Sequence, residues 1–197
     1  MLLYNSAVSG NCYKVRLTAA QLQIPLELQE LDVVDRSQRP AVIGSLTPVL
    51  RVPVLVLDDG RPMFESNAII DYLAEGSALM PEDPYERQQV LAWQFFEQYE
   101  IEPNLAVARF FRLFDLEPGE SLWRQKQEGG RKGLDALERG LRGKEYLVAD
   151  RYTVADISLY GYTHVAAEGE FDLEPYPWIR AWLERVAAQP GHIRITD

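Results

Sequence analysis

Residues 52–75, VPVLVLDDGRPMFESNAIIDYLAE, constrain the fold of this chain more than any other stretch. A proline directly precedes an apolar run, and within a β-sheet proline is confined to the first residue of a strand or to an edge. The run ends in Asp-Asp-Gly, which is typical of a hairpin turn, and RPMFE has the pattern of the returning strand. SNAIIDYLAE then has the apolar spacing of a helix. The stretch therefore predicts a strand, a turn, a second strand and a helix in close succession.

The chain before residue 52 predicts the rest of a small α/β unit. Residues 2–4 form a short strand candidate, the polar loop NSAVSGN follows, and CYKVRLTAAQLQI has apolar residues at helical spacing. LELQELDV alternates apolar and polar residues as a half-buried strand does, and RSQRPAVIGSL predicts a short irregular helix. Alternating strands and helices of this kind favour a mixed sheet covered by helices.

From residue 85 onward the strand signals stop and helical spacing takes over. Leu91, Phe95 and Tyr99 form one stripe, and Pro103 predicts a kink or a break further along. The glycines in SLWRQKQEGGRKGLDALERGL weaken the helix prediction for the first half of that segment. TVADISLYGYTHVAAE and PWIRAWLERVAAQP predict two final helices.

The first of these final helices begins with a capping box. In it, Thr153 and Asp156 satisfy each other's backbone donors at the helix start. We therefore expect three segments: residues 1–77 as an α/β domain, 78–86 as a linker rich in acids and prolines, and 87–197 as an all-helical domain.

Charge and composition exclude several classes of function. The formal net charge of −10 disfavours a nucleic-acid partner and an anionic membrane surface, both of which need a basic face. The opening MLLYNSAVSG lacks the basic region and the long apolar run of a signal peptide, so we expect a cytoplasmic protein. Cys12 is the only cysteine and there are two histidines, which exclude an internal disulfide or a Cys-x-x-Cys pair and make a metal site unexpected.

The chemistry of residues 52–66 suits an amino-acid ligand. Val52 precedes a proline and opens a strand, so its N–H and C=O can remain unpaired by the sheet and are available to a peptide-like ligand that would add a strand of its own. Ser66 stands at a helix start, where a hydroxyl, free N–H groups and the positive helix end favour a carboxylate. Glu65 beside it supplies an acceptor for an ammonium group. An isolated Glu-Ser pair is usually only a solvated charge and a helix cap, but Val-Pro thirteen residues earlier points to a ligand.

Four stretches together resemble the cytosolic glutathione transferase superfamily: LYNSAVSGNCYKVRL, RVPVLVLDDGRPMFESNAIIDYLAE, YTVADISLYGY and YPWIRAWLERVAAQP. They span most of the chain in the family's order. The resemblance implies a thioredoxin-like α/β N-terminal domain, an all-α helical C-terminal domain and a homodimer. It also implies that Glu65 and Ser66 hold the γ-glutamyl end of glutathione, that Val52 pairs with its cysteinyl backbone, and that Pro53 is a cis-proline.

The resemblance places the sulfur of glutathione at the loop SAVSGNCYK. Ser9 aligns with the catalytic serine of serine-type, zeta- or theta-like members, and Asn11 could add a donor. Lowering a thiol pKa from about 8.5 by two units needs roughly 2.7 kcal/mol. A hydroxyl hydrogen bond to a charged group gives about 1.5–3 kcal/mol and a helix N-terminus up to about 2 kcal/mol, so neither a metal nor a base is required. Cys12, near the same helix start, is the rival reactive group.

At the glycine end of glutathione this chain departs from the family's pattern. Many relatives have Asn-Pro-x-Gly-Lys before Val-Pro, whereas this chain has TPVLRVP, so Thr47 and Leu50 replace the usual asparagine and glycine. Arg51 keeps a cation that could meet the glycine carboxylate, and Gln38 could contribute. The second-substrate pocket is expected between the domains, where two arginines could favour an anionic electrophile. It would be lined by Val8, Asn104, Ala108, Arg109, Phe111 and Arg112.

The leading hypothesis is a glutathione transferase that binds glutathione as co-substrate, ionises its thiol and conjugates it to a small hydrophobic electrophile, as in detoxification. An isomerase or a dehalogenase would begin with the same thiolate attack. One alternative is a non-catalytic interaction or regulatory member of the superfamily, and another is a glutathione-dependent thiol reductase acting through Cys12. The presence of all four ligand residues at 52, 53, 65 and 66 favours the enzyme, because non-catalytic members tend to lose them.

Overall fold

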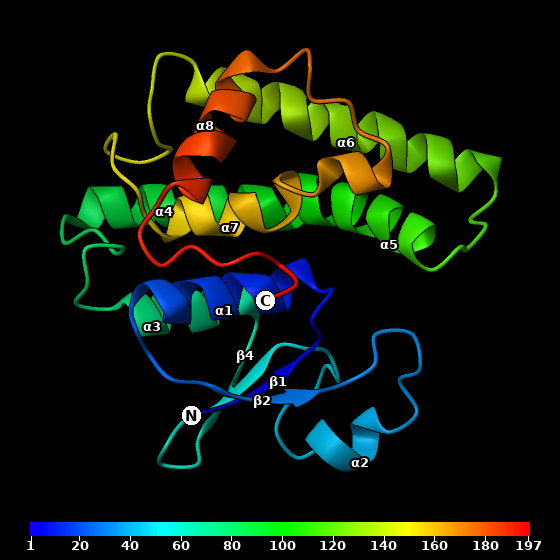
Figure 1. Cartoon of the computed structure of the whole chain (residues 1–197), viewed down its shortest axis with the longest axis vertical. Helices are drawn as coiled ribbons and strands as arrows, with labels where there is room; N and C mark the ends of the chain where they lie inside the picture. Colours follow the sequence, from blue (N-terminus) through cyan, green and yellow to red (C-terminus); the bar gives the residue numbers. More distant parts are fainter. The chain divides into compact units, whose positions relative to one another are not determined.

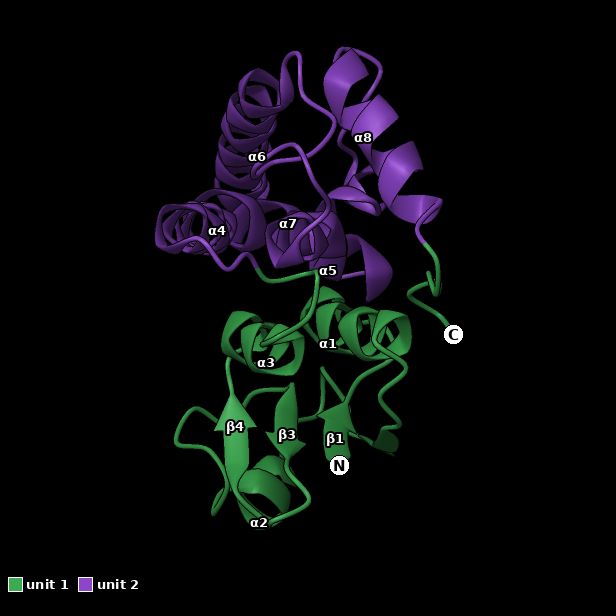
Figure 2. Cartoon of the chain, turned by 90° about the vertical axis from the view of Figure 1, so that its left-hand side faces the viewer, with its two compact units in different colours: residues 1–80, 190–197 green, residues 81–189 purple.

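The computed structural model describes all 197 residues and divides into two compact units (Figure 2). The first comprises residues 1–80 together with 190–197, and the second comprises residues 81–189. The sequence predicts a linker at 78–86 and assigns the C-terminal residues to the helical domain. In the structure the division falls inside that linker, and the C-terminal segment belongs to the α/β unit.

The first unit is a four-stranded mixed sheet covered by helices (Figure 1). The strand order is β2-β1-β3-β4; β1 pairs in parallel with β2, and the other two pairings are antiparallel. Helices α1 and α3 lie on one face of the sheet and α2 lies on the other. The elements are β1 (Leu2–Asn5), α1 (Gly10–Gln21), β2 (Glu27–Glu30), α2 (Arg39–Ile43), β3 (Val54–Val56), β4 (Pro62–Phe64) and α3 (Ser66–Ala74).

The strand register brings three connecting segments to one edge of the sheet. Val54, the first residue of β3, is paired with Tyr4 in β1 and with Phe64, the last residue of β4. The loop after β1, the segment before β3 and the segment after β4 therefore leave the sheet at the same edge. These segments contain Ser9, Val52 and Glu65 respectively.

The prediction that β2 is half-buried is wrong, because all four of its residues are exposed. Leu28, the apolar residue in its middle, is 46% exposed. The physical reason is position: β2 is an edge strand that pairs only with β1, so one side of it has no neighbouring strand.

The second unit is entirely helical. Its first three helices are continuous, and Pro103 lies inside the π-helical middle segment, whose wider turn accommodates the missing N–H without ending the helix. The capping box of Thr153 and Asp156 is confirmed. The helices are α4 (Pro84–Phe96), η1 (Glu97–Ala106), α5 (Val107–Leu113), α6 (Glu120–Leu141), α7 (Val154–Thr163), η2 (Ala166–Gly169) and α8 (Pro177–Ala187).

The glycines of α6 do not shorten that helix, which begins at Glu120 and contains all of them. They mark close approaches instead. A Cβ on Gly133 would lie 2.9 Å from the carbonyl oxygen of Glu100, and one on Gly130 would lie 2.2 Å from the ring of Phe171. Close packing against η1 and against Phe171 therefore explains the glycines that weakened the helix prediction. None of the helices combines the length and the apolar character needed to cross a bilayer.

Candidate functional site

The segment before β3 has an unusual backbone. The Val52–Pro53 peptide bond is cis, which confirms the sequence prediction. β3 begins only at Val54, so Val52 lies outside the ladder, as a peptide-binding segment requires. Leu50, which replaces the glycine common in relatives, has a φ of 53° and thus adopts the left-handed conformation that glycine would favour.

A buried arginine that the sequence analysis did not single out holds this segment. Arg39, on α2, is 4% exposed and donates from Nη1 to the carbonyl of Leu50 at 3.1 Å and from Nη2 to that of Asp32 at 2.7 Å. Its neighbour Gln38 is the N-cap of α2 without a side-chain capping bond, and Gln38 and Arg51 are both exposed. Arg39, the neighbour of Gln38, thus holds the backbone beside Arg51, so it links the two residues predicted for the glycine end.

The start of α3 offers both parts of an amino-acid site. Glu65 has a φ of 68°, is exposed, and makes no side-chain capping bond. The first helical bond runs from the N–H of Ile69 to the carbonyl of Glu65 at 3.0 Å, so the preceding N–H groups stand before the ladder, at the positive end of the helix. This arrangement can bind a carboxylate beside a carboxylate side chain that can accept from an ammonium.

The starts of α1 and α3 are joined through one side chain. The Oδ1 of Asn11 accepts from the hydroxyl of Ser66 at 3.2 Å and from Nζ of Lys14 at 3.0 Å. Ser9 is the N-cap of α1, and its Oγ accepts from the N–H of Cys12 at 3.3 Å. The structure therefore brings Asn11 and Ser66 into direct contact and places Ser9 one turn or less from both Asn11 and Cys12.

Cys12 has the opposite character from a reactive thiol. It is fully buried, and this burial raises its pKa to about 11, although hydrogen bonds from Ser9 and Ser6 and the charge of Arg16 lower it in part. A cysteine nucleophile needs exposure and a depressed pKa. The geometry thus argues against the reductase hypothesis that uses Cys12.

The residues predicted for the second substrate lie in both units. Val8 is half-buried in the loop before α1, Asn104 donates to the carbonyl of Glu100 at 2.8 Å, Ala108 is fully buried and Phe111 is half-buried.

The two arginines in this predicted set have partners within the helical unit. Arg109 pairs with Glu168 at 2.6 Å, and Arg112 pairs with Glu170 at 2.7 Å. Their charges are thus compensated locally, which removes the physical basis for expecting an anionic electrophile.

Comparison with known proteins identifies the family to which this fold belongs. Residues 3–80 match the family model described as glutathione S-transferase, N-terminal domain, and residues 90–190 match the model for the C-terminal domain. The chain belongs to the cytosolic glutathione S-transferase superfamily.

Individual relatives agree over nearly the whole length. A crystal structure of a glutathione S-transferase from Pseudomonas fluorescens is 44% identical with a TM-score of 0.95, over 100% of this chain and 98% of that one. A Caenorhabditis elegans protein named probable maleylacetoacetate isomerase is 29% identical over 98% of this chain and 91% of its own length. The disulfide-bond oxidoreductase YfcG of Escherichia coli is 26% identical over 94% of this chain and 89% of its own.

Proposed function

We propose that this protein is a glutathione transferase that binds glutathione along the sheet edge, ionises its thiol beside Ser9 and transfers the sulfur to a small, mostly apolar electrophile. Family membership supports the transferase class. The observation that carries the specific proposal is the convergence of the Ser9 loop, the cis Val52–Pro53 bond and the Glu65–Ser66 helix start at one sheet edge.

In this proposal the tripeptide is bound by backbone and charge. The cysteinyl residue of glutathione pairs with the backbone of Val52, outside the sheet ladder. The γ-glutamyl carboxylate lies at the N-terminus of α3, and its ammonium lies against Glu65. The glycine carboxylate lies near Arg51, an exposed cation without an ion pair, and Gln38 stands at the start of the neighbouring α2.

The thiolate is stabilised by hydrogen bonding at the start of α1. The Oγ of Ser9 accepts from the N–H of Cys12, which leaves its own hydroxyl hydrogen to donate. A thiolate is a stronger acceptor than the neutral thiol of Cys12, so the hydroxyl turns toward it when glutathione is bound. The sulfur then forms a bond to the electrophilic carbon while a leaving group such as halide departs, and the thiol proton passes to solvent.

Substitution of Ser9 tests this role. Ser9→Ala removes the donor and should lower kcat/KM by about 10- to 100-fold, the equivalent of roughly 1.5–3 kcal/mol. Ser9→Thr keeps the hydroxyl and the helix cap and should retain most activity. Steady-state assays with a panel of halogenated and unsaturated electrophiles provide the measurement. Equal activity of the Ala and Thr variants, both folded, would exclude Ser9 as the thiolate donor.

The same assays separate the remaining functions. Cys12→Ala should leave conjugation intact because the thiol is buried and protonated. If instead it abolishes a glutathione-dependent disulfide reductase activity, the reductase hypothesis stands. Turnover of a maleyl substrate would indicate the isomerase reaction for which the Caenorhabditis elegans relative is named. A folded protein that is not retained on immobilised glutathione would support the non-catalytic module.

We further propose that the protein acts in the cytosol as a homodimer. The predicted stripe of Leu91, Phe95 and Tyr99 lies on α4 and η1, and its three side chains are 39%, 56% and 75% exposed. Apolar side chains aligned on one helix face are typical of a contact surface. A second copy of this chain is the expected occupant.

A further inference from the structure

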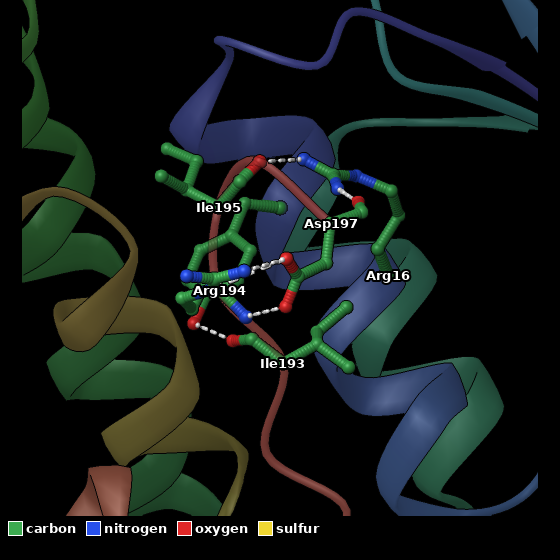
Figure 3. Close-up of polar contacts among 6 residues, drawn as sticks. Arg16, Ile193, Arg194, Ile195 and Asp197 are labelled. Atoms are coloured by element: carbon green, nitrogen blue, oxygen red, sulfur yellow. Dashed lines mark hydrogen bonds and ion pairs between the residues drawn. The ribbon is translucent and has the colours of Figure 1, made fainter.

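A buried arginine is one of the residues that hold the C-terminal segment, residues 190–197, against the rest of the α/β unit (Figure 3). Arg16, on α1, is 5% exposed. Its Nη2 donates to the carbonyl of Ile195 at 2.8 Å, and its Nη1 donates to the carbonyl of Asp197. The same Nη2 also donates to the carbonyl of Ala7 at 3.0 Å. One guanidinium therefore joins the C-terminal segment to the loop that leads to Ser9.

The peptide groups of Ala7 are held from two directions. Its carbonyl accepts from Arg16, while its N–H donates to Oε2 of Glu30 at 3.0 Å. Two residues further on, the N–H of Ser9 donates to the carbonyl of Ser6 at 3.0 Å. The position of the Ser9 loop thus depends on two side chains of opposite charge, and of these Arg16 is the one that also contacts the C-terminal segment.

The C-terminal segment has two further anchors, one to α1 and one within the segment. The hydroxyl of Tyr13 donates to the carbonyl of Ile193 at 2.7 Å. The side chain of Arg194 pairs with the carboxylate of Asp197 at 3.1 Å, and the N–H of Arg194 donates to that carboxylate at 2.8 Å. This turn orients the backbone carbonyl of Asp197 toward Arg16.

Burying the guanidinium of Arg16 costs free energy, which is unexpected for a contact with a purely structural role. Its guanidinium is desolvated and its Nε is buried without a hydrogen-bond partner. Desolvation lowers the pKa of Arg16 by more than the negative charges of Glu30 and Asp197 raise it. A buried cation without full compensation costs free energy. Its field reaches the start of α1, since the charge of Arg16 lowers the pKa of Cys12, the residue that donates its N–H to Ser9.

We propose that Arg16 is a positioning residue for the reacting sulfur, and that residues 190–197 act through it as a strap that holds the Ser9 loop. The inference rests on the proposed function, because it assigns a role in the ionisation of bound glutathione. It predicts that loosening the strap moves Ser9 relative to the sulfur, while the distant grip on the γ-glutamyl and glycine ends is unchanged.

Two ligands separate these effects. S-methylglutathione has no ionisable thiol, so its affinity, measured by calorimetry, reports the grip on the tripeptide alone. The pH titration of thiolate ultraviolet absorption in the glutathione complex reports the environment of the sulfur. Arg16→Gln should raise the pKa of the bound thiol by about one unit, a roughly tenfold smaller ionisation constant, with S-methylglutathione affinity within about twofold of wild type.

Further variants allow the proposal to be tested even if the Arg16→Gln variant does not fold. Arg194→Ala alters an exposed side chain, loosens the turn at Asp197, and should shift the thiol pKa in the same direction by a smaller amount. In the Arg16→Gln background it should have no further effect, because the link it acts through is gone. Arg61→Ala, at an exposed arginine paired with Asp59, is the matched control. It should change neither the pKa of the bound thiol nor the affinity for S-methylglutathione.

The outcomes are distinct. An unchanged thiol pKa in folded Arg16→Gln, or in Arg194→Ala if the first variant does not fold, overturns the strap. Additive shifts in the double variant overturn the coupling between Arg16 and the C-terminal segment. Failure of the wild-type protein to bind S-methylglutathione overturns the proposed function itself, and the positioning role with it.

Discussion

At the scale of single residues, the candidate site combines strained backbone with buried charge. Leu50 and Glu65 both have positive φ angles, of 53° and 68°, and they stand just before and just after the β3–β4 hairpin. Non-glycine residues in sparsely populated backbone regions cost about 1–3 kcal/mol each and cluster at functional sites. Strain on both sides of one hairpin agrees with a ligand grip that uses backbone groups.

Asp156 is the residue whose loss should destabilise the helical unit most. Its Oδ1 accepts from the N–H of Leu147 at 3.1 Å and from Nε1 of Trp182 at 2.9 Å, and its Oδ2 accepts from the N–H of Thr153 at 2.9 Å. Asp156→Ala leaves these buried donors unpaired and should lower the free energy of unfolding by about 3 kcal/mol or more. Asp156→Asn keeps an acceptor only for the donors that bind Oδ1. Its free energy of unfolding should lie between those of wild type and the Ala variant. Urea denaturation measures both, and a change below about 1 kcal/mol for the Ala variant would contradict this role.

The pH dependence of stability provides a second readout for this carboxyl group. Burial raises the pKa of Asp156 to about 6, although its hydrogen bonds lower it in part. The folded state then holds the proton more tightly than the unfolded state, so the contribution of Asp156 to stability falls as pH rises from about 4 to about 6. The Asn variant should lack this slope.

At the scale of elements, α1 ends in a backbone conformation that its residue at that position does not favour. The N–H of Ile24 donates to the carbonyl of Ala19 at 2.8 Å, and that of Gln23 donates to the carbonyl of Ala20 at 3.1 Å, which is the Schellman pattern of helix termination. Gln23 occupies the left-handed position with a φ of 56° and is exposed. Glycine is the residue that this position favours.

Gln23→Gly should therefore raise the free energy of unfolding by about 0.5–1 kcal/mol, because the left-handed conformation costs a non-glycine residue about 1–2 kcal/mol and glycine loses part of that gain in entropy. Gln23→Val, β-branched at the same exposed site, should destabilise the protein. Thermal and urea unfolding of both variants are the measurement. A glycine variant no more stable than wild type would show that the conformation is not strained.

The elements that the sequence predicts well are those with strong local signals. The hairpin and α3 follow from Asp-Asp-Gly and the apolar spacing after it, and the start of α7 follows from Thr153 and Asp156. Exposure of β2 was missed because alternation of residues does not tell an edge strand from a central one. The glycines of α6 weaken the helix prediction because the residues that they pack against lie elsewhere in the chain.

The candidate site divides in the same way. The cis bond at Pro53 was predicted through the family resemblance. The sequence did not predict the buried arginines Arg16 and Arg39, which hold the backbone of the site. Charged residues are usually exposed, and no local pattern marks a buried one. Residues 190–197 have no periodicity, and their position depends on Arg16, which lies 179 residues before Ile195. The spacing of residues along the sequence predicts local structure and does not predict contacts of such long range.

At the scale of the whole molecule, the proposed homodimer is open to a direct test. Phe95→Asp places a charge in the middle of the exposed stripe on α4 and η1, where burial of an unpaired charge would cost several kcal/mol. The variant should be a folded monomer by sedimentation velocity, while wild type is a dimer. Leu122→Asp, at an exposed leucine on α6 away from the stripe, should remain dimeric. A dimeric Phe95→Asp protein would place the contact elsewhere.

The central claim is that one sheet edge binds the backbone and amino-acid end of glutathione so that its sulfur lies at the start of α1. A crystal structure of the glutathione complex tests this most directly. The account predicts the sulfur within about 3.2 Å of Ser9 Oγ, paired backbone groups at Val52, and the γ-glutamyl group at Glu65 and Ser66. Glutathione bound elsewhere on the protein, or a sulfur directed to Cys12, would contradict it.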